Sequence, residues 1–168
     1  WEAMLAVHLT APFRILRSAS NFIREAAKRE AEAGTPRHRK VVNISSTSGV
    51  YGNAGQANYA AAKAGINGLT RAMAKEWGRY KVNVNSVAFG LIMTRLTQPL
   101  TSGDASVDIA GRTIAVGVQP ERLKAAEATI PLGRGGTPEE AAGAVYMFCI
   151  PESNYVSGQV LVCGGGRP

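Results

Sequence analysis

A tyrosine and a lysine four positions apart are the side chains in this sequence best suited to proton transfer. Tyr59 and Lys63 stand at i and i+4 of a predicted helix, so both side chains leave the same face of that helix. An ammonium group fixed beside a phenol stabilises the phenolate, which brings proton exchange toward the working pH range. The pair therefore predicts a site of general acid and base catalysis.

A serine joins this pair from the segment that precedes the helix. Residues 40–45 form a β-branched run, and Ser46 follows at its carboxyl end, the edge at which open parallel sheets bind ligands. A hydroxyl at that edge polarises a substrate carbonyl or stabilises a developing oxyanion. Tyr-x-x-x-Lys pairs also occur on helices by chance, so a surface lysine beside a half-buried tyrosine is the alternative interpretation of the pair alone.

Hydrophobic periodicity predicts the elements that would position these residues. The predicted elements are helices at residues 1–33, 58–80, 120–128 and 138–150 and strands at residues 40–45, 82–88 and 159–163. Thr137 is expected to cap the last helix, because a proline and two acidic residues follow it. This order predicts an α/β fold with a doubly wound parallel sheet.

Two further stretches are predicted to lie outside these elements. Residues 46–56 are rich in Ser and Gly and are expected to form a loop. Residues 106–119 place a glycine between two alternating runs, which predicts a hairpin within an insertion at residues 102–119. Without internal repeats or low-complexity tracts, residues 1–168 are expected to belong to one domain.

Composition excludes several function classes. The chain is 45% hydrophobic and 18% charged, as expected of a globular protein with a core. Part of the net charge of +7 comes from residues 24–40, but no aromatic residue lies between Phe22 and Tyr51. A nucleic-acid site would need stacking aromatics, so a solvated helix end and loop is favoured. A basic rim that attracts an acidic carrier or a phosphorylated substrate is the alternative.

The cysteine count favours a reducing compartment. Cys149 and Cys163 are too few for a disulfide framework and have no His or Cys partners at metal-ligand spacing, so no metal is expected. No apolar run approaches the roughly 18 residues of a membrane span. We therefore expect a cytoplasmic protein without membrane or nucleic-acid partners.

The run NISSTSGVYGNAGQANYAAAKAGINGLT, residues 43–70, resembles the active-site segment of the short-chain dehydrogenases/reductases. It is most similar to the 3-oxoacyl-acyl-carrier-protein reductases, whose pattern GNxGQxNYAxxKAG is matched from Gly52 to Gly65. The resemblance continues along the chain except at residues 102–119, and it implies a Rossmann-like domain. In the family the serine precedes the tyrosine by thirteen positions, which selects Ser46 rather than Ser45.

The resemblance also implies a reaction, in which a hydride passes between a nicotinamide ring and a carbonyl or secondary alcohol carbon. Tyr59 would exchange the proton, Lys63 would stabilise the phenolate and bind the nicotinamide ribose, and Ser46 would orient the substrate oxygen. Asn53 and Gln56 are implied as further substrate residues.

A second matching segment implies the cofactor loop. The run VNVNSVAFGLIMT, residues 82–94, resembles the strand and loop that hold the nicotinamide carboxamide in the family. The resemblance implies that Gly90, Ile92 and Thr94 hold the nicotinamide carboxamide in this protein. Phe89 replaces the family's proline, which puts the stiffness of this loop in question.

His8 stands where the family has its fourth catalytic residue, an asparagine. Pro12 lacks an N–H group and crowds the carbonyl of His8, so that carbonyl is expected to be free. In the family this carbonyl helps to hold a water in a proton relay to the lysine, so the substitution need not abolish catalysis. A purely structural histidine packed against the sheet is the alternative.

The family's glycine-rich phosphate loop, its selector for the adenine ribose and its first strands, roughly ninety residues, have no counterpart in residues 1–168. The cofactor is therefore expected to be NADP or NAD without a choice between them, and these 168 residues alone are expected to be inactive. The expected substrate is a 3-oxoacyl thioester on an acyl carrier protein. A dehydrogenase of 3-hydroxyacyl-CoA or another alcohol is the alternative, since histidine at this position also occurs in relatives acting on acyl-CoA.

The last expectations concern assembly and a function class without catalysis. The resemblance implies a homotetramer formed through the helices at residues 1–33 and 58–80. An alternative from another class is a non-catalytic fragment or partner subunit. The complete set of Ser46, Tyr59 and Lys63 argues against that alternative, because a non-catalytic protein has no need of all three.

Overall fold

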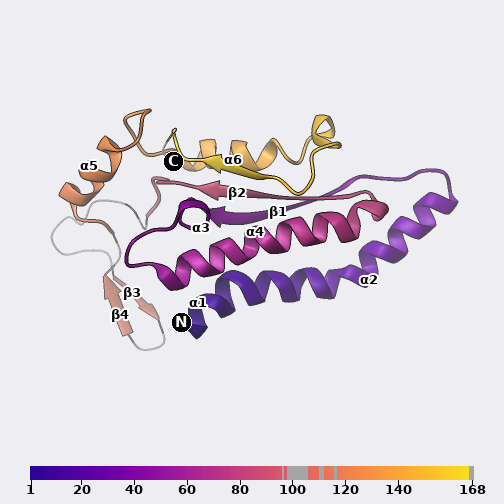
Figure 1. The fold of residues 1–168 in the computed structure, drawn as a ribbon, viewed down its shortest axis with the longest axis horizontal. Helices are drawn as coiled ribbons and strands as arrows, with labels where there is room; N and C mark the ends of the chain where they lie inside the picture. Colours follow the sequence, from indigo (N-terminus) through magenta and orange to yellow (C-terminus); the bar gives the residue numbers. More distant parts are fainter. Residues whose placement is uncertain (96, 98–105, 110–111, 116, 167–168) are drawn as a thin grey trace.

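The computed structural model describes residues 1–95, 97, 106–109, 112–115 and 117–166. Its centre is a parallel sheet in the order β1 (Arg39–Ser46), β2 (Val82–Phe89) and β5 (Val160–Cys163). Helix α6 (Pro138–Tyr146) lies along one side of the sheet, and α4 (Ala57–Trp77) lies along the other (Figure 1). This arrangement confirms the predicted α/β fold with a parallel sheet.

Strand register brings the carboxyl ends of these strands to one edge. Along β1 and β2, Arg39 pairs with Val82 and Ser46 pairs with Phe89, so the two strands end together. Phe89 also pairs with Cys163, the last residue of β5. Helix α4 makes the connection between β1 and β2 that parallel pairing requires. Residues that follow the strands are therefore neighbours in space although they are distant in sequence.

The amino-terminal helix contains a wide turn that the sequence pattern did not predict. Helix α1 (Glu2–Leu5) continues through a π-helical segment, Ala6–Thr10, into α2 (Ala11–Glu32). The N–H of Ala11 donates to the carbonyl of Ala6, five positions back. Pro12 follows at once, and it can neither donate to the His8 carbonyl nor fit closely beneath it. The π segment is therefore where the helix accommodates this proline.

Two other boundaries differ from the prediction. The expected loop at residues 46–56 contains a short helix, α3 (Ser48–Tyr51). The helix expected to reach about residue 150 ends at Tyr146, and Ile150 is extended with φ −78° and ψ 156°. Because Ile150 precedes Pro151, the α conformation is disfavoured there. The short 3₁₀ helices Gly78–Tyr80 and Pro151–Ser153 follow α4 and α6.

The predicted start of α6 is confirmed. The Thr137 hydroxyl accepts a hydrogen bond from the N–H of Glu140 at 3.2 Å, and the Glu140 carboxylate accepts one from the N–H of Thr137 at 2.8 Å. This reciprocal capping satisfies two helix donors that would otherwise lack partners. Helix α5 (Pro120–Ala128) also has the predicted bounds.

The stretch expected to contain an insertion is described in part. Strand β3 (Ser106–Ile109) pairs antiparallel with β4 (Arg112–Ala115). Residues 102–105, 110, 111 and 116 of the expected insertion lie outside the described residues. The relation of this segment to a substrate pocket stays a prediction.

Side-chain alternation gives the sheet two different faces. Val82 and Val84 of β2 pack with Met73 and Trp77 of α4, while Val87 packs on the opposite side against α6. Three polar residues share the α4 side with the valines and hydrogen bond to α4; they are Asn43, Ser45 and Ser86. The core between the sheet and α4 thus becomes polar toward the carboxyl ends of the strands, where the candidate site lies.

Candidate active site

Lys63 is a buried cation next to Tyr59. Its side chain leaves α4 toward β1, the residue is 7% exposed, and its Nζ donates to the Ile44 carbonyl at 2.9 Å. The same Nζ lies 5.6 Å from the centre of the Tyr59 ring. Burial lowers the pKa of the Lys63 ammonium, since a charge removed from water is less favourable. At this distance the ammonium can still stabilise negative charge on the phenol electrostatically.

Ser46 ends β1 in a tight turn. It is 8% exposed, and its Oγ accepts a hydrogen bond from the N–H of Ser48 at 3.2 Å. The next residue, Gly49, packs directly on α4, because a Cβ at this position would lie 2.5 Å from the carbonyl carbon of Lys63. Only glycine allows this approach. The turn after β1 and the Lys63 turn of α4 are therefore in direct contact.

Asn53 and Gln56 are connected to this turn through Ser48. The Ser48 hydroxyl donates to Gln56 Oε1 at 3.2 Å, and Asn53 Nδ2 donates to the same oxygen at 2.8 Å. Both Asn53 and Gln56 are exposed. The structure thus places Ser46, Asn53 and Gln56 along one chain of hydrogen bonds at the amino end of α4.

His8 faces Tyr59 with its side chain. The two rings are 5.1 Å apart between centroids and meet edge-on at 89°. Burial, and after it the positive charge of Lys63, lowers the pKa of His8, so the imidazole is neutral at neutral pH. Protonation in acid would place a second cation beside Lys63. His8 and Lys63 also line one cavity of about 350 Å³ beside β1.

The loop after β2 is held by backbone contacts at its start. The N–H of Gly90 donates to the Cys163 carbonyl at 3.0 Å, and the N–H of Thr47 donates to the Phe89 carbonyl at 2.9 Å. A Cβ at Gly90 would lie 2.9 Å from the Cα of Gly164, so the two glycine backbones are in close contact. These bonds join the ends of β1, β2 and β5 although Phe89 replaces proline.

The rest of this loop is tied to the segment before α6. Ile92 forms a parallel bridge with Gly136, and the Gly136 carbonyl accepts from the N–H of Met93 at 2.8 Å. The N–H of Thr94 donates to the Thr97 hydroxyl at 2.7 Å, and the Thr94 side chain is exposed. Gly90, Ile92 and Thr94 therefore follow a defined path along the carboxyl edge of the sheet.

Several polar residues behind the site were not singled out from the sequence. Ser45 and Asn67 of this group are buried and bond to the backbone of the catalytic region: Ser45 Oγ donates to the Lys63 carbonyl at 3.0 Å, and Asn67 Nδ2 donates to the Gly49 carbonyl at 3.4 Å. A signal was present, because Asn67 stands four positions after Lys63 on the same helix face.

The described part of the chain offers neither a metal site nor a membrane segment. Among its residues, no three His, Cys, Asp or Glu side chains lie together in a way that could hold a metal ion. Cys149 and Cys163 are both free thiols, and burial raises the pKa of Cys163. Within the same described residues, no helix is both long and apolar enough to cross a membrane.

A parallel sheet whose first crossover helix carries a Tyr-x-x-x-Lys pair beside the end of β1 is the arrangement expected of the short-chain dehydrogenases/reductases. The family model described as Enoyl-(Acyl carrier protein) reductase matches residues 1–167, and the chain belongs to this family of short-chain dehydrogenases/reductases. The resemblance found in the sequence is thereby confirmed.

Individual relatives are similar along the whole chain. The 3-oxoacyl-(acyl-carrier-protein) reductase of Thermotoga maritima is 35% identical over 167 residues, which are 99% of this chain and 56% of that protein. The (3R)-3-hydroxyacyl-CoA dehydrogenase of Mus musculus is 33% identical over 167 residues, 99% of this chain and 54% of that protein.

A solved structure is also similar. The structure of a 4-hydroxyisoleucine dehydrogenase complexed with NADH and succinate has a TM-score of 0.67 and 27% sequence identity. The match covers 95% of this chain and 55% of that one. The chain thus spans little more than half the length of the relatives that it matches.

Proposed function

We propose that the protein is a nicotinamide-dependent oxidoreductase that transfers a hydride between its cofactor and a carbonyl or secondary alcohol carbon. The observation that carries the proposal is the placement of Tyr59 beside both the His8 ring, at 5.1 Å between ring centroids, and the Lys63 ammonium, at 5.6 Å from the centre of the Tyr59 ring. A phenol near a neutral ring and a buried cation is suited to exchange a proton with a substrate oxygen.

Each residue has a role in the proposed reduction. When bound, the nicotinamide supplies the hydride that is added to the carbonyl carbon. The Tyr59 hydroxyl gives its proton to the carbonyl oxygen, and the charge left on the phenolate is stabilised by Lys63. The Ser46 hydroxyl donates a hydrogen bond to the same oxygen and orients it, while Asn53 and Gln56 line the substrate side. The reverse steps oxidise an alcohol.

The residues present fit the nicotinamide half of the cofactor. Gly90 and Gly164 carry no side chains at the carboxyl edge of the sheet, the edge at which open parallel sheets bind ligands, so a flat ring that binds there would meet backbone. We propose that Gly90, Ile92 and Thr94 bind the carboxamide and that Lys63 binds the ribose. His8 is proposed to support the proton relay to Lys63. Either NAD or NADP satisfies these contacts.

The proposed substrate is a 3-oxoacyl thioester carried on an acyl carrier protein. Relatives named as 3-oxoacyl-(acyl-carrier-protein) reductases support it, and the similarity to a (3R)-3-hydroxyacyl-CoA dehydrogenase favours 3-hydroxyacyl-CoA as the second candidate. The test is to mix the complete protein, with its natural flanking sequence, with NADPH or NADH and a 3-oxoacyl thioester on either carrier. We expect substrate-dependent loss of reduced-nicotinamide absorbance. The absence of turnover with every carbonyl and alcohol tried would contradict the proposal and favour a non-catalytic partner.

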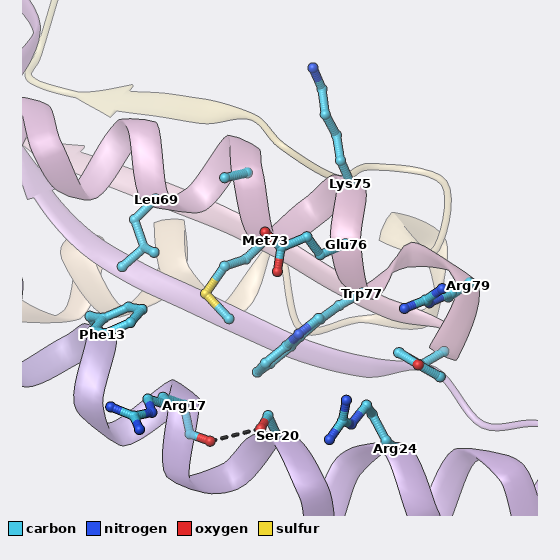
Figure 2. A pocket seen from close by; sticks show the side chains of 12 residues that line it. Phe13, Arg17, Ser20, Arg24, Leu69, Met73, Lys75, Glu76, Trp77 and Arg79 are labelled. Carbon is cyan, nitrogen blue, oxygen red and sulfur yellow. Dashed lines mark hydrogen bonds between the residues drawn. The ribbon is translucent and has the colours of Figure 1, made fainter.

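We further propose that the protein forms a homo-oligomer, a tetramer by resemblance, through α2 and α4. A groove of about 590 Å³ runs between these helices (Figure 2). Phe13 of α2, which is 46% exposed, points toward Leu69 and Met73 of α4 in this groove. A second copy would cover this partly apolar surface.

Sedimentation velocity at micromolar concentration should therefore show an oligomer. Ala72→Glu, which adds a charge to the groove, should shift the protein toward monomer, whereas Thr35→Glu in the exposed loop after α2 should not. A monomeric parent protein at this concentration would count against the proposal.

A further inference from the structure

We propose that Ser45, rather than being a spectator beside Ser46, is a positioning residue that fixes Lys63 for the proton transfer to and from Tyr59. This inference rests on the proposed function of Tyr59 and Lys63. It goes beyond that function because the Ser45 hydroxyl bonds to the main-chain carbonyl of Lys63 and has no assigned role toward substrate or cofactor.

Lys63 is held at both of its ends by two consecutive residues of β1. Ser45 Oγ donates to the main-chain carbonyl of Lys63 at 3.0 Å, and the main-chain carbonyl of Ile44 accepts from Lys63 Nζ at 2.9 Å. Ser45 is 3% exposed, so water does not compete freely for its hydroxyl. The bond from Nζ to the Ile44 carbonyl restricts the rotamers of the long side chain, and the bond from Ser45 fixes the backbone from which that side chain leaves.

The direction of the Ser45 side chain follows from strand geometry. Side chains alternate along β1, and Asn43, two positions earlier, donates from Nδ2 to the Thr70 hydroxyl of α4 at 2.8 Å. Ser45 therefore faces α4 as well. Its pairing opposite Ala88 of β2 fixes the strand in this register.

Gly49 encloses the same residue from another side. A Cβ on Gly49 would lie 2.5 Å from the carbonyl carbon and 2.6 Å from the Cβ of Lys63. The Lys63 backbone is thus in contact with Gly49 on one side and hydrogen bonded by Ser45 on another. Loss of the Ser45 hydroxyl removes the hydrogen bond to the Lys63 backbone, whereas the van der Waals contact with Gly49 stays.

Position matters because the interaction of the ammonium with the phenol is electrostatic. In a site removed from water such an interaction depends strongly on distance, and a misplacement of about 1 Å costs up to roughly 100-fold in rate. Ser45→Ala is conservative in size, so we expect a smaller displacement and a fall in kcat of about tenfold with KM little changed. The pH dependence of kcat should change as well, because the proton transfer proposed for Tyr59 depends on the position of the Lys63 ammonium.

Ser86→Ala is a matched control for this variant. Ser86 is also fully buried, lies on the neighbouring strand, and donates to an α4 side chain, Asn67 Oδ1, at 3.2 Å. Both variants remove one buried hydroxyl that bonds to α4, so both should lower the melting temperature to a similar extent. Only Ser45→Ala should change kcat and the pH profile.

A second measurement does not require turnover. In protein containing isotope-labelled lysine, NMR titration follows the Lys63 signal, which is assigned by its loss in Lys63→Arg. We expect this signal to titrate closer to the ordinary lysine range in Ser45→Ala, because a shift of the Lys63 backbone weakens the bond from Nζ to the Ile44 carbonyl and lets water reach the ammonium. In Ser86→Ala the signal should keep its parental titration.

The outcomes separate the two proposals. If Ser45→Ala and Ser86→Ala are alike in kcat, pH profile and Lys63 titration, the positioning role of Ser45 is wrong. If Tyr59→Phe and Lys63→Met both keep parental turnover, the proposed function is wrong, and the lysine titration still decides whether Ser45 holds Lys63.

Discussion

Tyr59→Phe in the complete protein is expected to lower kcat by about two orders of magnitude or more, the scale on which general acid and base groups contribute. The substitution removes only the hydroxyl, and the ring keeps its edge-on contact with His8 and its place beside Lys63. Folding should therefore be intact. The measurement is the steady-state rate of reduced-nicotinamide oxidation with a 3-oxoacyl thioester, together with a circular dichroism spectrum.

Tyr155→Phe provides the matched control, because Tyr155 is fully exposed and lies before β5, at the other end of the sheet from Tyr59. It makes the same chemical change away from the candidate site and should keep the parental rate. Comparable turnover in Tyr59→Phe would remove Tyr59 from the mechanism.

Lys63→Met is expected to abolish most turnover and yet to leave the fold at least as stable as the parent. The variant loses the ammonium that we propose to stabilise the phenolate and to bind the ribose, so kcat should fall by about 100-fold or more and cofactor affinity should fall as well. Methionine fills a similar volume without a charge. Replacing a buried charge with a packed apolar side chain is neutral or stabilising by roughly 1 kcal/mol or more.

The pKa shift of Lys63 also predicts the direction in which stability changes with pH. Burial lowers the pKa of Lys63 below its ordinary value of 10.5, so between the two values the folded state binds fewer protons than the unfolded state. Below the lowered pKa, both states are protonated and the cost of burying the ammonium is fully present. As the pH rises through that pKa, the folded state loses the proton and the cost is relieved.

The melting temperatures of the parent and of Lys63→Met should therefore become more alike as the pH rises through the lowered pKa of Lys63. The advantage of Lys63→Met over the parent is expected to be largest at low and neutral pH and to shrink in the alkaline range. Lys124→Met, an exposed lysine on α5, should show no such trend. A Lys63→Met protein that melts well below the parent at neutral pH would contradict the stability prediction, and parental turnover in that variant would remove Lys63 from the mechanism.

The sequence predicted well those helices and strands that are specified by their own residues. Periodicity identified β1, α4 and β2, and the cap at Thr137 was visible because the residues that make it are three positions apart. The π segment before Pro12 was not predicted, since a proline in a helix can be accommodated by a kink, a break or a wider turn. The π segment packs on α4, where Leu9 lies against Gly65, and such a contact between distant segments is not visible in the local sequence.

The sequence predicted which residues belong to the candidate site better than it predicted how they are arranged. The resemblance selected Ser46, Tyr59 and Lys63, but it gave no reason to notice Ser45, whose importance depends on which face of β1 meets α4. It also did not indicate that the His8 side chain faces Tyr59. The path of the loop after Gly90 depends on Cys163 and Gly136, which are far away in sequence.

The pairing of β2 with β5 has a consequence for how this fold can diversify. Ser86 pairs with Val160, so the chain between them closes a loop of roughly 70 residues, and the entropy cost of closure grows only with the logarithm of its length. Lengthening that loop by about ten residues costs on the order of 0.1 kcal/mol. The loop includes the segment between Thr94 and Pro120, whereas Ser46, Tyr59 and Lys63 lie before it. Insertions that reshape the segment after β2 therefore change the free energy of folding very little. They also leave the part of the sequence that carries Ser46, Tyr59 and Lys63 unchanged.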